Sequence, residues 1–201
     1  MNSTRLALIA VVPAALLALL TACASPVAVP AGTTAAPSVT RTTDSTASHN
    51  ESDTTFAQMM VTHHEGAIEM AALAETKGSS SEVRNLAGRI RAAQGPEIEQ
   101  MRGWLKDWGE PAPEDSDMGG MGHEGMDMGG LDQQAAMDEL TKQNGEAFDK
   151  AFLTLMIQHH QGALTMANQE VATGANTEAV ALAESIIAAQ QKEIAEMQAL
   201  S

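Results

Sequence analysis

The feature that most constrains the fold of this chain is an internal duplication. Residues 53–101 align with residues 149–197 at a constant offset of 96 positions and without gaps, and 20 of the 49 aligned positions are identical. The identities run through the whole segment and include an adjacent pair of histidines in each copy: His63 with His64, and His159 with His160. Identity spread in this way indicates that one structural unit was duplicated. The chain is therefore expected to contain two copies of one motif.

Each copy is predicted to form two helices joined at a glycine. In the first copy, a helix over about residues 53–77 stops at Gly78, because glycine is favoured just after a helix. The residues at 79–82 read as a capping box that starts the second helix. This helix is expected to end near Trp108, since Gly109 and two prolines follow it.

The second copy repeats this pattern. It predicts helices over about residues 146–173 and 177–200, which Gly174 separates, and a short helix from about Asp132 leads into them. Pro96 lies inside the second helix of the first copy, where it removes one backbone hydrogen bond and is expected to kink the helix. The second copy has no proline at the equivalent position, so the copies are expected to differ there.

Two helical hairpins, each with one apolar face, bury these faces most simply as an antiparallel four-helix bundle. No segment shows the alternation of apolar and polar residues that is typical of a strand. The chain has three Phe, two Trp and no Tyr, so its core must consist of Leu, Ile, Val, Ala and Met. We predict an all-α domain over residues 53–201, in which the repeats 53–108 and 132–201 flank a Met- and Gly-rich loop at 109–131.

The N-terminal segment reads as a targeting signal followed by a linker. Arg5 and an apolar run to Leu20 precede Cys23, which is typical of a lipoprotein signal peptide over residues 1–22 with Cys23 lipid-modified. A cleaved signal with an incidental cysteine is the alternative. Residues 23–52 are mostly Ser, Thr, Ala and Pro and predict a disordered tether. The protein is thus expected to be lipid-anchored in the cell membrane, facing the cell surface or the periplasm.

The charge of the chain limits its partners. A formal net charge of −15 argues against nucleic-acid binding and against electrostatic docking on anionic lipid. Membrane contact is therefore expected through the lipid anchor only. An acidic surface suits a protein that attracts cations. The sequence does not identify a protein partner, and it is compatible with homo-oligomerisation.

Helical periodicity places histidines, methionines and a glutamate of each copy on the inward faces of the predicted helices. A buried glutamate is costly unless it is paired, and a buried histidine needs hydrogen-bond partners. These side chains are the candidate metal ligands: Met60, His63, His64, Met70, Glu97 and Met101 in the first copy, and Met156, His159, His160, Met166, Glu193 and Met197 in the second.

Two explanations fit these buried polar groups. In a structural one, His63, Gln94 and Glu97 satisfy one another as a polar network, and the methionines only fill space. In the other they bind a metal ion, which the recurrence of the whole set favours. Imidazole and thioether donors together favour copper, because Cu(I) takes thioethers and Cu(II) accepts imidazole nitrogen and carboxylate oxygen. A structural zinc site would more often use cysteine, and residues 53–201 contain none.

The loop between the copies offers a second group of soft donors. Residues 116–130 are rich in glycine and acids, so their methionines have no reason to be buried as core. A low-complexity linker without function is the alternative. The functional interpretation is a thioether and imidazole arm that captures soft cations, through Met118, Met121, His123, Met126 and Met128.

Both copies carry the motif Met-x-x-His-His-x-Gly-Ala-x-x-Met-Ala, at residues 60–71 and 156–167, followed by Ala-Gln-x-x-Glu-Ile at 93–98 and 189–194. This pair of motifs closely resembles the bacterial family known as domain of unknown function 305, over essentially all of residues 53–201 apart from the loop. The resemblance implies a ferritin-like four-helix bundle that is usually exported. Some members of that family are periplasmic copper-binding proteins implicated in copper resistance, with His and Met ligands. The same role is thereby implied for the His and Met residues of these motifs.

Three functions remain in competition. The first is a lipid-anchored, extracytoplasmic protein that sequesters or buffers copper and catalyses no reaction. The second is a di-metal oxidase like other ferritin-like bundles, but these use Glu-x-x-His motifs, and the chain contains none. The third is a non-catalytic interaction module whose His and Met residues are only core. Binding of copper to the protein, measured by native mass spectrometry, separates the first from the third.

Overall fold

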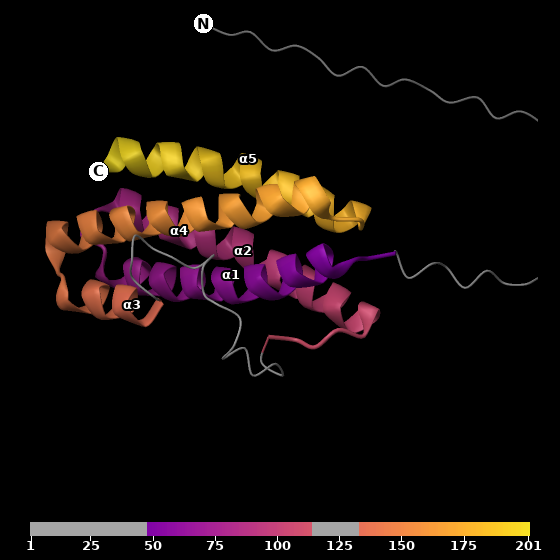
Figure 1. The fold of residues 1–201 in the computed structure, drawn as a ribbon. Helices are drawn as coiled ribbons and strands as arrows, with labels where there is room; N and C mark the ends of the chain where they lie inside the picture. Colours follow the sequence, from indigo (N-terminus) through magenta and orange to yellow (C-terminus); the bar gives the residue numbers. More distant parts are fainter. Residues whose placement is uncertain (1–47, 114–132) are drawn as a thin grey trace, which may run out of the picture. The chain divides into compact units, whose positions relative to one another are not determined.

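The computed structural model describes residues 48–113 and 133–201, which fold into five helices (Figure 1). These two ranges contain no strand, and none of their helices is both long and apolar enough to cross a bilayer. The helices are α1 (Glu51–Lys77), α2 (Ser81–Trp108), α3 (Gln133–Lys142), α4 (Gly145–Thr173) and α5 (Thr177–Leu200).

Helices α1 and α4 form the central pair, with α2 packed on α1 and α5 packed on α4 (Figure 1). The central helices are antiparallel, because the start of α1 meets the end of α4. Asn50 Nδ2 donates to the carbonyl oxygen of Thr173 at 2.8 Å, and at the other end the backbone N–H of Ser79 donates to Asp149 at 2.8 Å. The predicted antiparallel bundle of two hairpins is confirmed. The short helix α3 packs on α1 and α4.

The helix ends follow from local sequence. Gly78 and Gly174 end α1 and α4, and the N–H of each donates to the carbonyl oxygen four residues earlier. Gly109 ends α2 with φ of 76°, a conformation that costs glycine little. Ser80 caps the start of α2 through its hydroxyl. Helix α2 continues through Pro96 as one helix over Ser81–Trp108.

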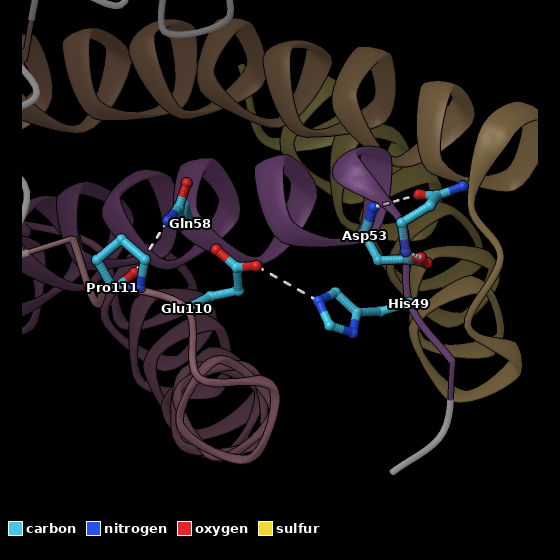
Figure 2. Close-up of polar contacts among 6 residues, drawn as sticks. His49, Asp53, Gln58, Glu110 and Pro111 are labelled. Atoms are coloured by element: carbon cyan, nitrogen blue, oxygen red, sulfur yellow. Dashed lines mark hydrogen bonds and ion pairs between the residues drawn. The ribbon is translucent and has the colours of Figure 1, made fainter. Parts of the chain in front are cut away.

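The first described residues of the chain precede the predicted domain boundary at residue 53. Helix α1 starts at Glu51, and Asn50 forms a capping box with Asp53. The ring of His49 stacks on that of Trp108, with centroids 4.6 Å apart and planes 7° from parallel. Its Nε2 lies 3.5 Å from Glu110 Oε1 (Figure 2). Stacking and capping therefore hold His49 and Asn50, which fall inside the predicted 23–52 tether, against the bundle.

One aspartate from each copy locks the turn of the other copy. Asp149 accepts hydrogen bonds from the backbone N–H groups of Ser79 and Ser80 and from the Ser79 hydroxyl, at 2.6–2.8 Å. Asp53 accepts in the same way from the two backbone N–H groups of the α4–α5 turn, at 2.9–3.1 Å. The two hairpins are thus joined by reciprocal charge-assisted hydrogen bonds. The alignment of the copies pairs these aspartates but does not reveal this role.

The apolar core has two clusters, one on each side of the histidines. On α1, residues 56–61 belong to one cluster and residues 67–74 to the other. On α4, residues 148–156 and 163–167 divide in the same way. The four histidines fall between the clusters on both helices, where α1 and α4 pack together.

Candidate metal centre

His63 of α1 and His159 of α4 face each other at the centre of the bundle. Their ring centroids are 3.6 Å apart and their planes are tilted by 43°. Both are buried, with 2% and 4% of their surface exposed. The duplication therefore brings equivalent side chains from the two copies into direct contact, although they are 96 positions apart in the sequence.

The second histidine of each pair is held by the glutamate of its own copy. His64 Nε2 lies 2.8 Å from Glu97 Oε2, and His160 Nε2 lies 2.7 Å from Glu193 Oε2. An ionised carboxylate only accepts hydrogen bonds, so Nε2 of each ring is the donor, and whenever such a ring is neutral its Nδ1 keeps a lone pair. The two bonds differ by 0.1 Å, so Pro96 does not disturb the first one.

Several buried nitrogens of this cluster have no hydrogen-bond partner. Both ring nitrogens of His63 are in this state, as is Nδ1 of His64, His159 and His160. A buried imidazole nitrogen without a partner costs free energy comparable to a lost hydrogen bond. Unpartnered nitrogens of neutral imidazole are potential metal ligands.

The electrostatics of the cluster keep the central rings neutral. Burial, and then the charges of His64 and His160, lower the pKa of His63 to about 3. Burial and the same kind of repulsion hold the pKa of His159 well below its ordinary value. Neutral imidazole is the form that binds metals.

The six predicted methionine ligands are buried in the two core clusters, each with at most 8% of its surface exposed. Each cluster contains three of them, and each trio combines residues from both copies. Met60, Met101 and Met166 lie in one cluster, and Met70, Met156 and Met197 in the other. Thioethers therefore lie on both sides of the histidine group.

Two glutamines that were not predicted as ligands also stand out. Gln94 is 3% exposed, and neither its side-chain oxygen nor its nitrogen has a hydrogen-bond partner. Its counterpart Gln190 is equally buried, with an unpartnered Oε1. Their identity in both copies was the signal that could have identified them. The alternative network of His63, Gln94 and Glu97 does not form, because Glu97 bonds to His64.

The buried donor atoms are therefore of two kinds: imidazole nitrogen of the histidines, and thioether sulfur in the core clusters on either side. Within residues 48–113 and 133–201, no three side chains of His, Cys, Asp or Glu come together as a metal site. In general, imidazole and thioether donors together favour copper over zinc. The remaining predicted residues lie outside the described part of the chain: Cys23, Met118, Met121, His123, Met126 and Met128.

Residues 53–201 match the family described as domain of unknown function (DUF305). The chain belongs to the DUF305 family. No curated protein matches it. The resemblance inferred from the paired His-His motifs is confirmed.

Solved DUF305 structures share the fold. A protein from Streptomyces coelicolor is 32% identical with a TM-score of 0.65, over 74% of this chain and 91% of that one. A fragment from Deinococcus radiodurans is 30% identical with a TM-score of 0.66, over 75% of this chain and 95% of that one. A third similar structure is CopM in its Cu(II)-bound form, 34% identical with a TM-score of 0.62, over 74% of this chain and 94% of that one. CopM has also been solved in Cu(I)-bound and silver-bound forms.

Proposed function

We propose that this DUF305 protein binds copper at the α1–α4 crossing and sequesters or buffers the ion outside the cytoplasm, anchored through Cys23. The observation that carries the proposal is the group of buried imidazoles with unpartnered nitrogens around His63 and His159. The similarity of this chain to CopM, a protein with Cu(I)-bound and Cu(II)-bound structures, supports the choice of metal. The proposal includes no catalytic step.

The residues divide into ligands and positioning groups. Both ring nitrogens of His63 and Nδ1 of His159 have no hydrogen-bond partner. His64 and His160 offer Nδ1, while Glu97 and Glu193 accept from the opposite nitrogen. A carboxylate bonded to a metal-binding histidine fixes its tautomer and makes it a better donor. We therefore assign Glu97 and Glu193 to positioning, although the sequence suggested them as ligands.

The thioethers extend the range of oxidation states that the site accommodates. Imidazole binds both Cu(I) and Cu(II), whereas thioether sulfur favours Cu(I). Methionine also suits an oxidising compartment, because a free thiol is oxidised there more readily than a thioether. The trios of Met60, Met101 and Met166, and of Met70, Met156 and Met197, supply this softer component next to the histidines.

Native mass spectrometry of the full chain with Cu(I), Cu(II), Ag(I) and Zn(II) tests the proposal. The wild-type protein is expected to take up copper in a fixed stoichiometry and to lose at least one equivalent when His63 and His159 are both replaced by alanine. His49→Ala is the matched control, since His49 lies on Trp108 away from the crossing. An unchanged apo mass with an intact helical fold would instead support an interaction module with a structural core.

A further inference from the structure

A recess leads from the surface of the bundle to the central histidine pair. It has a volume of about 240 Å³, and both His63 and His159 line it. Its remaining wall comes from α1, through residues that include Glu65, Gly66 and Glu69, and from Gln133 at the start of α3. The unpartnered ring nitrogens of His63 therefore belong to a side chain that borders an accessible space.

The side chain of Gln133 lies against α1 at this recess. Its Nε2 donates to the backbone carbonyl oxygen of Gly66 at 3.1 Å and to Glu69 Oε2 at 3.2 Å. This close approach depends on glycine, because a Cβ atom at position 66 would lie 2.6 Å from Gln133 Oε1. The amide is thus held by two hydrogen bonds, one of them at an exposed position.

The recess is also acidic, and its acidic residues come from the first copy only. Glu65 is paired with Arg102, whereas Glu69 accepts from the neutral amide of Gln133. The counterparts of Glu65 and Glu69 in the second copy are Gln161 and Thr165, which carry no charge. A carboxylate beside a low-dielectric wall raises the local concentration of cations and their rate of association.

We propose that this recess is the access route by which a copper ion reaches His63 and His159, and that Gln133 is its gate. The proposal rests on the function proposed above. Glu69 attracts the ion and holds the gate closed through Gln133, and movement of the Gln133 amide opens the path. Because α3 belongs to neither hairpin, it can shift without separating the four main helices.

Two variants remove the gate by independent means. Gln133→Ala deletes the amide, and Gly66→Ala displaces it, because the new methyl group occupies the position of Gln133 Oε1. Gln134→Ala is the matched control for the first, since Gln134 bonds only to the exposed Asp138. Gly103→Ala is the control for the second, because nothing lies within 4 Å of a Cβ atom there.

The measurement is the rate of Cu(I) transfer between the full protein and a colorimetric Cu(I) chelator, in both directions. Both gate variants are expected to speed uptake and release together by about threefold or more, while the equilibrium affinity changes by less than about twofold, since a gate changes a barrier and not the bound state. The two controls are expected to keep wild-type rates.

Glu69→Gln tests the charge at the recess. The new amide oxygen can still accept from Gln133, so the gate is kept while the charge is removed. The variant is expected to slow uptake and to weaken the dependence of uptake on ionic strength. Glu99→Gln, on the exposed side of α2, is the control and is expected to leave both unchanged. Copper binding with wild-type transfer rates in both gate variants overturns the access route but leaves the proposed function standing. A wild-type protein that binds no copper overturns both.

Discussion

The two copies of the duplicated hairpin are nearly identical at the centre of the bundle and different at its edges. The histidine pairs and their glutamates occupy aligned positions in the two copies. They make the same contacts, with Nε2–Oε2 distances of 2.8 Å for His64–Glu97 and 2.7 Å for His160–Glu193. At the surface, Glu69 of the first copy corresponds to Thr165 of the second. The central histidine contact therefore requires both copies. The proposed access route, in contrast, uses charged residues that only the first copy has.

The joints between the copies show the same contrast. Asp53 and Asp149 make equivalent hydrogen bonds to the turn of the other copy. Next to Asp53, however, lies the buried Glu170, whose counterpart next to Asp149 is Ala74. Burial and then the hydrogen bond and charge of Asp53 raise the pKa of Glu170 to about 8. One joint therefore depends on a protonated carboxyl group, and the other does not.

The largest effect is expected from breaking the central group in one copy only. Because His63 and His159 touch, removing either one should disrupt the same site. His63→Ala and His159→Ala are each expected to abolish the binding of the same copper equivalent, and the double variant should lose no further one. Native mass spectrometry measures this. Independent losses that add in the double variant would show that each copy owns a separate site.

The next effect concerns the two joints. Asp149→Asn weakens three charge-assisted hydrogen bonds to the α1–α2 turn and is expected to lower the free energy of unfolding by about 3 kcal/mol. Asp53→Asn is expected to cost more at pH 7, because the protonated Glu170 also donates a hydrogen bond to Asp53 and this bond is lost. Urea unfolding followed by circular dichroism checks both values. Equal losses would contradict the assigned role of Glu170.

A smaller effect is the pH dependence of stability that Glu170 gives to the joint at Asp53. The pKa of Glu170 is higher in the folded protein than in the unfolded chain, so its protonated form stabilises the fold. This contribution is fully present below about pH 4.5 and is lost as the pH rises to about 8. Glu170→Gln is expected to remove this decline and to raise stability at pH 8 by on the order of 2 kcal/mol. Thermal unfolding at several pH values measures it, and Glu178→Gln on the exposed start of α5 is the control.

The smallest effect tests whether the glutamates of the two copies contribute equally to copper binding. Glu97→Gln and Glu193→Gln each replace a carboxylate that fixes a histidine tautomer, and each is expected to weaken copper binding by about tenfold. The two losses should agree within about twofold, although Pro96 precedes only Glu97. Competition with a Cu(I) chelator of known affinity measures them. A much larger loss in one variant would show that the proline makes the copies unequal.

Much of the fold followed from the sequence because its signals are local. Gly78 and Gly174 end helices at the predicted positions, and the apolar stripes place the histidines inward. The start of α1 was misplaced by two residues, since Asn50 caps the helix from within a segment whose composition resembles a linker. The kink predicted at Pro96 stays a prediction.

The partners of the inward side chains could not be predicted in the same way. Periodicity shows which face a residue occupies but not the register between two helices. The sequence therefore suggested that His63, Gln94 and Glu97 interact, whereas Glu97 bonds to His64 and His63 meets His159. The reciprocal aspartate bonds were missed for the same reason, because they join residues about 70 and 123 positions apart.

The sequence by itself determined that this protein is a duplicated helical bundle with imidazole and thioether donors on its inner faces, because helix ends and helix faces depend on short stretches of chain. Only the tertiary structure decided that His63 of the first copy meets His159 of the second and that a recess lined by Gln133 reaches them. These features depend on how α1, α3 and α4 pack against one another, and the balance of burial, charge and hydrogen bonding that sets this packing acts between residues far apart in the chain.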